Sequence, residues 1–306
     1  MSTPTPRRAL VLLVSGVLLA MPTVATAQSL ANGSVSGRSM SGTGGNDRIK
    51  GTAHDDSLNA KGGNDKVRAR AGNDTVKGGG GHDVVDGSDG TDKIVGNAGN
   101  DSLLGGTGND DLNGGAGNDT VRGDDGNDRV QLGTGDDLGW GGAGNDELIG
   151  IDGNDAMHGD DGDDHTSGGG GNDRLWGDLG SDTMDGGDGN DLMYGGPGDE
   201  GNLYDRTIKR SMTGDAGDDT LVPGPGSDAV YGEEGFNHII VRSDGVADNL
   251  YCGLISDAGQ ANGLVTYVGT DADIRAKLDD VRKCDVEVLS ETDFVAKYAG
   301  IDLSLV

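Results

Sequence analysis

The most regular chemical feature of this 306-residue chain is an aspartate that returns every nine residues. From Gly42 to Tyr194 the chain divides into 17 consecutive nonapeptides, and the sixth residue of each is aspartate. These residues are Asp47, Asp56, Asp65, Asp74, Asp83, Asp92, Asp101, Asp110, Asp119, Asp128, Asp137, Asp146, Asp155, Asp164, Asp173, Asp182 and Asp191. Carboxylate oxygens are hard ligands, so carboxylates at so regular a spacing indicate repeated binding of cations.

The composition indicates the same class of partner. The chain carries a net charge of −30, contains 61 glycines and is only 32% hydrophobic, a combination typical of disordered chains. Order must therefore come from something other than apolar burial. A surface this acidic repels nucleic acid and anionic membranes, so neither is expected as a partner. Only six of the 53 acidic residues are glutamate, which favours a short carboxylate held close to a loop backbone.

The other positions of the nonapeptide keep their own phases, which a flexible low-complexity linker would not do. The fourth residue is glycine except at His54, and the eighth is aliphatic or methionine except at Gly139 and Thr166. Positions one to six predict a loop, and positions seven to nine predict a short strand with one inward apolar side chain. Stacked strands of this kind predict a parallel solenoid with a thin core, weaker at Gly139 and Thr166.

The nonapeptide frame decays after Tyr194 and resumes at Gly214. Residues 204–213, which lack glycine, predict an insert loop between two blocks of repeats. The repeats are therefore expected over residues 42–203 and 214–240. The sixth positions of the second block carry aspartate twice and then asparagine, at Asp219, Asp228 and Asn237.

The pattern GGxGxDxUx resembles the hemolysin-type calcium-binding repeats of the RTX (repeats-in-toxin) proteins. The resemblance covers roughly residues 42–240 and implies an all-β fold, a right-handed parallel β-roll or β-solenoid with two repeats in each turn. It implies multiple Ca²⁺ ions between loops stacked on the same side, held by loop carbonyls and by all the sixth-position carboxylates, Asp219 and Asp228 included. Asp101 would share one ion with Asp119, and Asp110 would share another with Asp128.

Calcium suits these donors better than magnesium or zinc does. Calcium takes roughly six to eight oxygen ligands in a flexible shell, whereas magnesium demands a tight octahedron and zinc favours histidine or thiolate. The five histidines show no metal-ligand spacing and are predicted to be loop residues: His54, His82, His158, His165 and His238.

The N-terminus has the form of a secretory signal peptide over residues 1–27. Two arginines precede an apolar run from Ala9 to Met21, and Ala25-Thr26-Ala27 offers a small-residue cleavage site. An uncleaved anchor is the alternative, and the arginine pair leaves the twin-arginine export route open. Residues 28–41 are predicted as a lead-in, and no other segment is apolar enough to span a bilayer. The protein is therefore expected to be secreted or located at the cell surface.

The glycine frame is absent from residues 241–306, which are predicted to form a small C-terminal cap. Cys252 and Cys284 are the only cysteines, and an exported chain meets oxidising conditions, so a disulfide between them is expected. Their surroundings also resemble the disulfide-closed C-terminal turns of secreted calcium-binding repeat proteins. Two separate free thiols are the alternative. Ile274, Leu278 and Val281 also fit one face of a predicted helix.

No catalytic motif accompanies the repeats. The sequence contains no HExxH helix, no GxSxG elbow and no Cys/His arrangement of known spacing. The expected function is therefore a non-enzymatic extracellular structural, adhesive or interaction module that folds on calcium binding, with extracellular or cell-surface macromolecules as further partners. A secreted enzyme or toxin-like effector with an unrecognised active site is the alternative. Ice binding is not expected, because outward threonines form no row at the third position.

Overall fold

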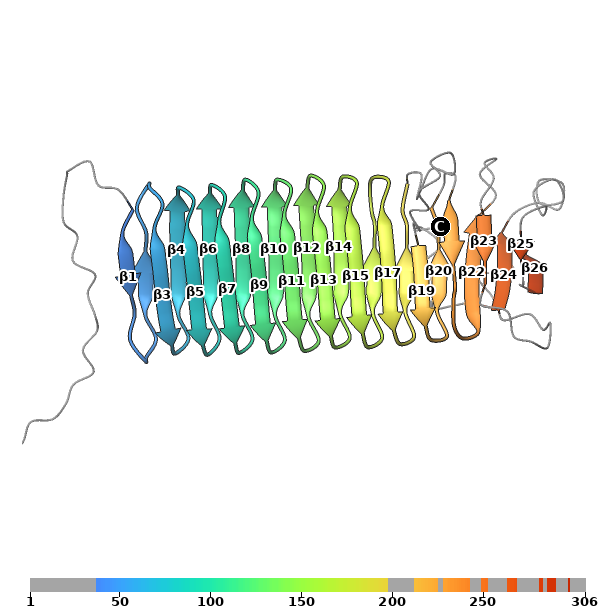
Figure 1. The fold of residues 1–306 in the computed structure, drawn as a ribbon, viewed down its shortest axis with the longest axis horizontal. Helices are drawn as coiled ribbons and strands as arrows, with labels where there is room; N and C mark the ends of the chain where they lie inside the picture. The colour runs from blue at the N-terminus through green and yellow to red at the C-terminus, as the bar shows by residue number, and fades with distance from the viewer. Residues whose placement is uncertain are drawn as a thin grey trace, which may run out of the picture.

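The computed structural model describes residues 37–197, 212–224, 228–242, 249–252, 263–268, 281–282, 285–289 and 297. The expected signal peptide, residues 198–211 of the repeat end and insert, and much of the C-terminal region lie outside these residues. The described residues form an elongated all-β solenoid with parallel strands (Figure 1), as the sequence predicted.

The strands form two parallel sheets of 13 strands each, and consecutive strands alternate between the two sheets. The odd sheet contains β1 (Ser39–Ser41), β3 (Ser57–Gly62), β5 (Thr75–Gly80), β7 (Lys93–Ala98), β9 (Asp111–Ala116), β11 (Arg129–Thr134), β13 (Glu147–Asp152), β15 (His165–Gly170), β17 (Thr183–Asp188), β19 (Met212–Ala216), β21 (Ala229–Tyr231), β23 (Asn249–Tyr251) and β25 (Val281–Arg282). The even sheet contains β2 (Arg48–Lys50), β4 (Lys66–Ala71), β6 (Val84–Asp89), β8 (Ser102–Thr107), β10 (Thr120–Asp125), β12 (Leu138–Ala143), β14 (Ala156–Asp161), β16 (Arg174–Trp176), β18 (Leu192–Tyr194), β20 (Thr220–Val222), β22 (Asn237–Arg242), β24 (Gly263–Val268) and β26 (Asp285–Leu289).

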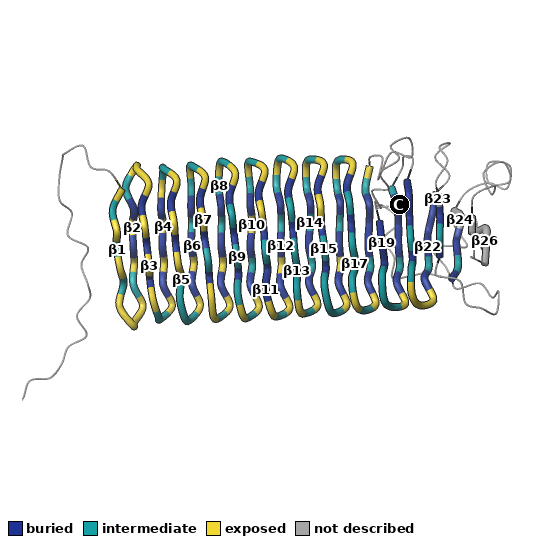
Figure 2. The backbone as a smooth tube through the Cα atoms, in the orientation of Figure 1, coloured by how far each residue is buried: buried dark blue, intermediate teal, exposed yellow. Residues whose placement is uncertain are grey.

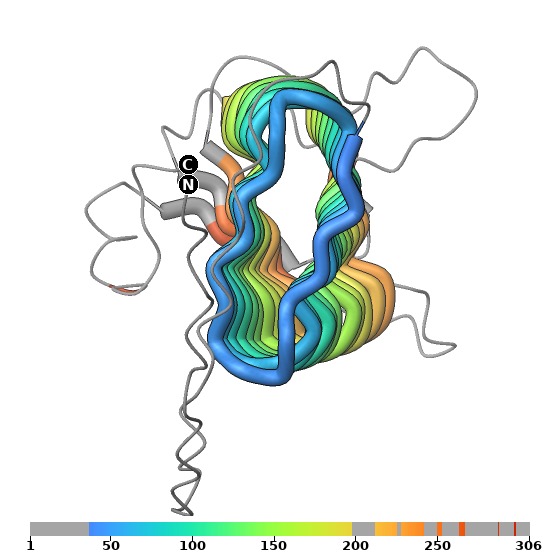
Figure 3. Tube along the Cα trace, turned by 90° about the vertical axis from the view of Figure 1, so that its left-hand side faces the viewer, coloured from blue at the N-terminus to red at the C-terminus, as the bar shows by residue number. Residues whose placement is uncertain are grey.

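Each regular turn of the solenoid takes two nonapeptides, so equivalent residues 18 positions apart lie side by side. Val121 of β10 pairs with Leu103 of β8 on one side and with Gly139 of β12 on the other. The backbone continues the same ladder into the loops, where the N–H of Thr120 donates to the carbonyl oxygen of Asp101 over 2.8 Å. Viewed along the long axis, the turns lie one behind another (Figure 3).

Most strands from β3 to β17 are six residues long, twice the predicted length. Each continues from positions seven to nine through positions one to three of the next nonapeptide, as β10 does over Thr120–Asp125. The loop is therefore only positions four to six. Sequence reasoning placed the first-position glycine in the loop, but its constraint is space inside the solenoid. A Cβ on Gly123 would lie closer than 3.0 Å to Oδ2 of Asp128 and to the carbonyl oxygen of Gly141.

The core is a narrow row of side chains from the eighth position of each nonapeptide, and it lies between the two sheets. Figure 2 shows the buried segments along the strands and the exposed ones concentrated in the loops. The row includes Val67, Val76, Val85, Ile94, Leu103, Leu112, Val121, Val130, Leu148, Met157, Leu175, Met184 and Met193, each 3% exposed or less. One apolar side chain per repeat is thus buried, as predicted.

The two repeats that lack an apolar eighth residue differ from each other. At Gly139 the space is filled by Leu132, which replaces the usual first-position glycine. A Cβ on Gly139 would lie 3.1 and 3.2 Å from the two methyl carbons of Leu132. At Thr166 the side chain is fully buried, and its hydroxyl has no hydrogen-bond partner. The expected weakness is therefore offset by packing at Gly139 and remains at Thr166.

Beyond residue 240 the described segments continue the two sheets. β22 pairs with β24 and β24 with β26 in the even sheet, while β23 and β25 extend the odd sheet. Val281, predicted to lie on a helical face, is in β25 instead, while Ile274 and Leu278 lie outside the described residues. Met212, predicted to lie in the insert, is instead the first residue of β19. It pairs with Met184, an eighth-position residue, and is fully buried, so it continues the row of core side chains.

Candidate metal centre

The recurrent aspartates occupy the last loop position before each strand and form two columns along the solenoid. One column follows the odd loops and the other the even loops, because residues 18 apart stack. From Asp56 to Asp191 each of these side chains is at most 4% exposed, and Asp219 and Asp228 are equally buried. The first of them, Asp47, is only half-buried. The structure therefore buries a carboxyl group in almost every loop, as a repeated internal site requires.

One carboxylate oxygen of each aspartate from Asp56 to Asp191, and of Asp219, joins neighbouring turns. The backbone N–H of Asp110 donates to Oδ1 of Asp128 over 2.7 Å, and that of Asp128 donates to Oδ1 of Asp146 over the same distance. The bond recurs in both columns, from Asp47 with Asp65 to Asp191 with Asp219. It places each carboxyl group directly against the loop of the previous turn.

The other carboxylate oxygen has no hydrogen-bond donor. Oδ2 is buried and unpartnered in every sixth-position aspartate from Asp65 to Asp191 and in Asp219. In the loop of Asp128, this oxygen and the carbonyl oxygen of Gly141 both lie beside the inner face of Gly123. Two acceptor oxygens thus face one space without a proton donor between them, an arrangement that requires a cation or a proton.

Asn237 shows what a neutral side chain does in the same place. Its Oδ1 accepts the N–H of Asp219 over 2.9 Å, as an aspartate would. Its Nδ2 donates to the carbonyl oxygen of Cys252 over 3.0 Å. Both atoms lie beside Gly232, the first-position residue equivalent to Gly123. The amide group supplies the donor that the aspartates lack. The lack of a hydrogen-bond donor for Oδ2, seen at Asp128, is therefore a property of the aspartate positions and not of the loop backbone.

The electrostatics of the columns also favour a bound cation. Burial raises the pKa of Asp110 to about 7 and that of Asp128 to about 6. The N–H donated from the previous turn lowers both values, and the charge of the next carboxylate in the column raises them again. Without a positive partner the buried carboxylate is disfavoured, because it has lost its hydration and faces like charges.

The first aspartate of each column is bonded differently. Oδ2 of Asp56 accepts the N–H of Thr52 over 2.5 Å and its hydroxyl over 2.9 Å, and Thr43 bonds Asp47 in the same way. Both carboxylates therefore have donors on the oxygen that is unpartnered further along. Cation binding at Asp47 or Asp56 would have to replace these threonine hydrogen bonds.

The inner donor set fits calcium. It consists of carboxylate and backbone carbonyl oxygens, the hard ligands that calcium prefers, and a bound divalent ion would supply the positive charge that Oδ2 lacks. The described part of the columns contains no histidine or thiolate donor of the kind that zinc favours.

A family model for the RTX calcium-binding nonapeptide repeat matches seven stretches of the chain. Together they cover more than half of it: residues 39–67, 61–103, 95–130, 104–139, 131–165, 167–199 and 211–239. The chain belongs to this family. A comparison with curated proteins finds no match. The RTX repeats account for the calcium-type donor set, and no helix among the described residues has the length and hydropathy needed to cross a lipid bilayer.

The histidine interpretation was only partly right. His54 and His82 are loop residues, but His158, His165 and His238 lie in strands β14, β15 and β22 of the RTX solenoid. A sequence signal for the position of His158 is nevertheless present. Aromatic rings recur at the ninth position at intervals of 18 residues, one full turn, in Trp140, His158, Trp176 and Tyr194.

Proposed function

We propose that this RTX protein is a secreted calcium-binding repeat protein that folds as calcium fills its two aspartate columns. The single observation that carries the proposal is the row of buried Oδ2 atoms without a hydrogen-bond donor, from Asp65 to Asp191. Adjacent members of a column, such as Asp110 and Asp128, would share an ion, with backbone carbonyls completing its shell. Asp219 and Asp228 would extend the array beyond the insert.

Folding would depend on the ion because apolar burial is so limited. Most nonapeptides bury one large apolar side chain and one carboxyl group, while ordering nine residues carries a large cost in backbone entropy. Ions that bind only the folded state shift the equilibrium by mass action, and the effect grows with each site. Free calcium outside cells suits extracellular sites of this chemistry, which fits a chain with a signal-peptide-like N-terminus.

The biological role we propose is a non-enzymatic structural, adhesive or interaction module. Long rows of equivalent surface residues along a rigid solenoid suit contact with an extended partner. On the odd sheet, for example, Lys93, Asp111, Arg129 and Glu147 form a row of alternating charge, in which Arg129 lies 3.0 Å from Glu147.

The disulfide between Cys252 and Cys284 belongs to the same proposal. Cys252 is fully buried at the end of β23, and no free cysteine is present among the described residues, which do not include Cys284. Mass spectrometry of the non-reduced secreted protein should detect one linked pair of peptides. Two thiols that alkylate without reduction would contradict this pairing.

Circular dichroism of the mature chain, expected to be residues 28–306, tests the central proposal. The spectrum should change cooperatively from coil-like to β-rich as calcium is added, with little response to magnesium. Calorimetry should give more than about ten calcium ions per chain, by the family's rule of ions between stacked loops. A β signal that persists in chelator at neutral pH, or only one or two binding sites, would overturn the proposal.

A further inference from the structure

The outer face of the even sheet carries a row of stacked rings. Trp140 of β12, His158 of β14 and Trp176 of β16 occupy the same position in successive turns. The His158 ring is parallel to that of Trp176 to within 3°, with centroids 4.3 Å apart, and lies 6.2 Å from that of Trp140 on the other side. The imidazole plane is thus parallel to two large rings, of which Trp176 stacks closely against it.

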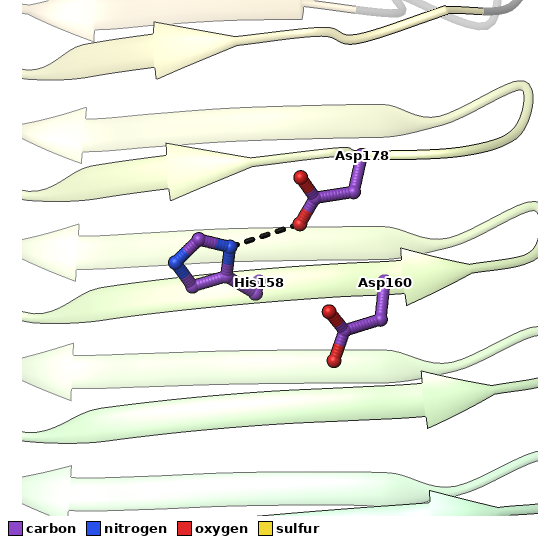
Figure 4. A group of neighbouring side chains, drawn as sticks. All are labelled: His158, Asp160 and Asp178. Atoms are coloured by element: carbon purple, nitrogen blue, oxygen red, sulfur yellow. Dashed lines mark hydrogen bonds and ion pairs between the residues drawn. The ribbon is translucent and has the colours of Figure 1, made fainter.

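Two carboxylates lie near this imidazole, and one of them contacts it. Nδ1 of His158 lies 2.9 Å from Oδ2 of Asp178, and Asp160 follows His158 by two residues on the same face of β14. One ligand atom from each of the three side chains lies within 4.8 Å of the other two. In Figure 4 the carboxylates of Asp178 and Asp160 both lie on the same side of the His158 ring, and the dashed line joins the ring to Asp178.

The electrostatics favour a positive ion between these groups. Burial raises the pKa of Asp160, and the neighbouring charge of Asp178 raises it further, while His158 and Arg122 act in the opposite direction. Asp160 also lines an open groove of about 480 Å³ together with Arg122 and Asp124, so an ion would reach the cluster from solvent.

We propose that His158, Asp160 and Asp178 bind one divalent first-row transition-metal ion, of which Zn²⁺ is the representative. An imidazole nitrogen and two carboxylate oxygens form a donor set that zinc accepts, with water in the remaining position. Calcium prefers oxygen ligands alone, so this outer site and the inner columns select different ions. The proposal for this outer site therefore does not depend on the proposal for the calcium columns.

The test uses Co²⁺ as a spectroscopic substitute for zinc in the calcium-saturated full chain. Trp140 and Trp176 are the only tryptophans of the protein, and both flank His158, so their fluorescence reports on this site alone. One equivalent of Co²⁺ should quench most of the fluorescence, and added Zn²⁺ should restore it by displacement. Quenching that does not saturate near one equivalent, or that added Zn²⁺ fails to reverse, would overturn the proposal.

Variants separate a metal site from a simple ion pair. His158→Gln should abolish saturable quenching, and Asp160→Asn and Asp178→Asn should each weaken Co²⁺ binding at least about 10-fold. Asparagine is chosen because both aspartates have positive φ, which asparagine tolerates. His165→Gln, on an exposed residue of the odd sheet, is the matched control and should behave as wild type.

Each variant is first checked for its calcium-dependent β signal by circular dichroism. If His158→Gln does not fold, the two asparagine variants decide the question alone. Co²⁺ affinity unchanged in both of them would show that the cluster is an ion pair and not a metal site.

Discussion

The side-chain amide of Asn237 donates a hydrogen bond to the carbonyl oxygen of Cys252, 3.0 Å away, where Asp128 presents a carboxylate oxygen to the side of Gly141 that carries its carbonyl oxygen. Oδ1 of Asn237 accepts the backbone N–H of Asp219, just as Oδ1 of an aspartate accepts the N–H of the previous turn. Asparagine and aspartate therefore differ at this position only in the second side-chain atom, an N–H donor in one and an oxygen acceptor in the other. An asparagine supplies its own donor at this position, whereas an aspartate such as Asp128, whose Oδ2 has no donor, needs a proton or a positive partner. The chain itself thus contains a neutral counterpart of the proposed calcium sites.

Alanine substitutions in the middle of the array should raise the calcium needed for folding. Asp119→Ala with Asp128→Ala removes two buried carboxylates that face neighbouring turns, so the calcium midpoint of the circular dichroism transition should increase several-fold. Asp125→Ala with Asp152→Ala is the control, because it removes the same charge from exposed third positions. Equal shifts in the two double variants would show that net charge, and not the column, governs folding.

Asparagine at the same positions should separate calcium binding from stability. In Asp119→Asn with Asp128→Asn, each amide can donate to the carbonyl group that faces it, as Asn237 does. Calorimetry should therefore show fewer calcium ions, while the β signal at low calcium should exceed that of the alanine double variant. Removing the buried unpaired acceptor would be worth about 1–3 kcal/mol per site. If the two double variants behave identically in calcium-free buffer, the analogy with Asn237 fails.

Without calcium, a lower pH should favour the folded state. Burial raises the pKa of Asp101, Asp155 and Asp182 to about 7 in the solenoid, against about 3.9 for an unfolded aspartate. The folded chain then binds more protons than the unfolded chain, so the free energy of unfolding increases as pH falls. This contribution is complete below about pH 4 and is lost as pH rises through about 7.

The measurement is circular dichroism of calcium-free protein between pH 8 and pH 5.5, above the sequence pI of about 4.1. The β signal should be larger at the acidic end. Calcium affinity should change in the opposite direction, since protons and calcium compete for the same oxygens. A calcium-free β signal that is largest at pH 8 would contradict the assignment of these carboxyl groups.

Leu132 should be a local determinant of stability. It fills the space left by Gly139, so Leu132→Ala should lower the free energy of unfolding of the calcium-loaded protein by about 2–5 kcal/mol. Denaturant unfolding at saturating calcium measures the change. Leu179→Ala is the control because Leu179 is 54% exposed, and its substitution should have little effect. A loss no larger than that of the control would mean that the turn at Gly139 tolerates a cavity.

The sequence by itself determined the nonapeptide repeat and its invariant aspartate, because these are matters of strict periodicity. Two repeats per turn, and with them two columns of aspartates, were implied only by the resemblance to the RTX repeats, and the 18-residue register of the strands confirms them. The buried eighth position followed in the same way, since it is the one apolar position in a chain with little else to bury.

Only the tertiary structure decided what each residue faces across the solenoid. The first-position residue Gly123 lies in a strand, and it is glycine because the carboxyl group of Asp128 and the carbonyl group of Gly141 leave no room for a Cβ. Leu132 compensates for Gly139, and Asn237 replaces an aspartate by bonding Cys252, for the same kind of reason. His158 meets Asp178 because stacking brings residues 20 positions apart into contact, and sequence spacing alone does not state that distance.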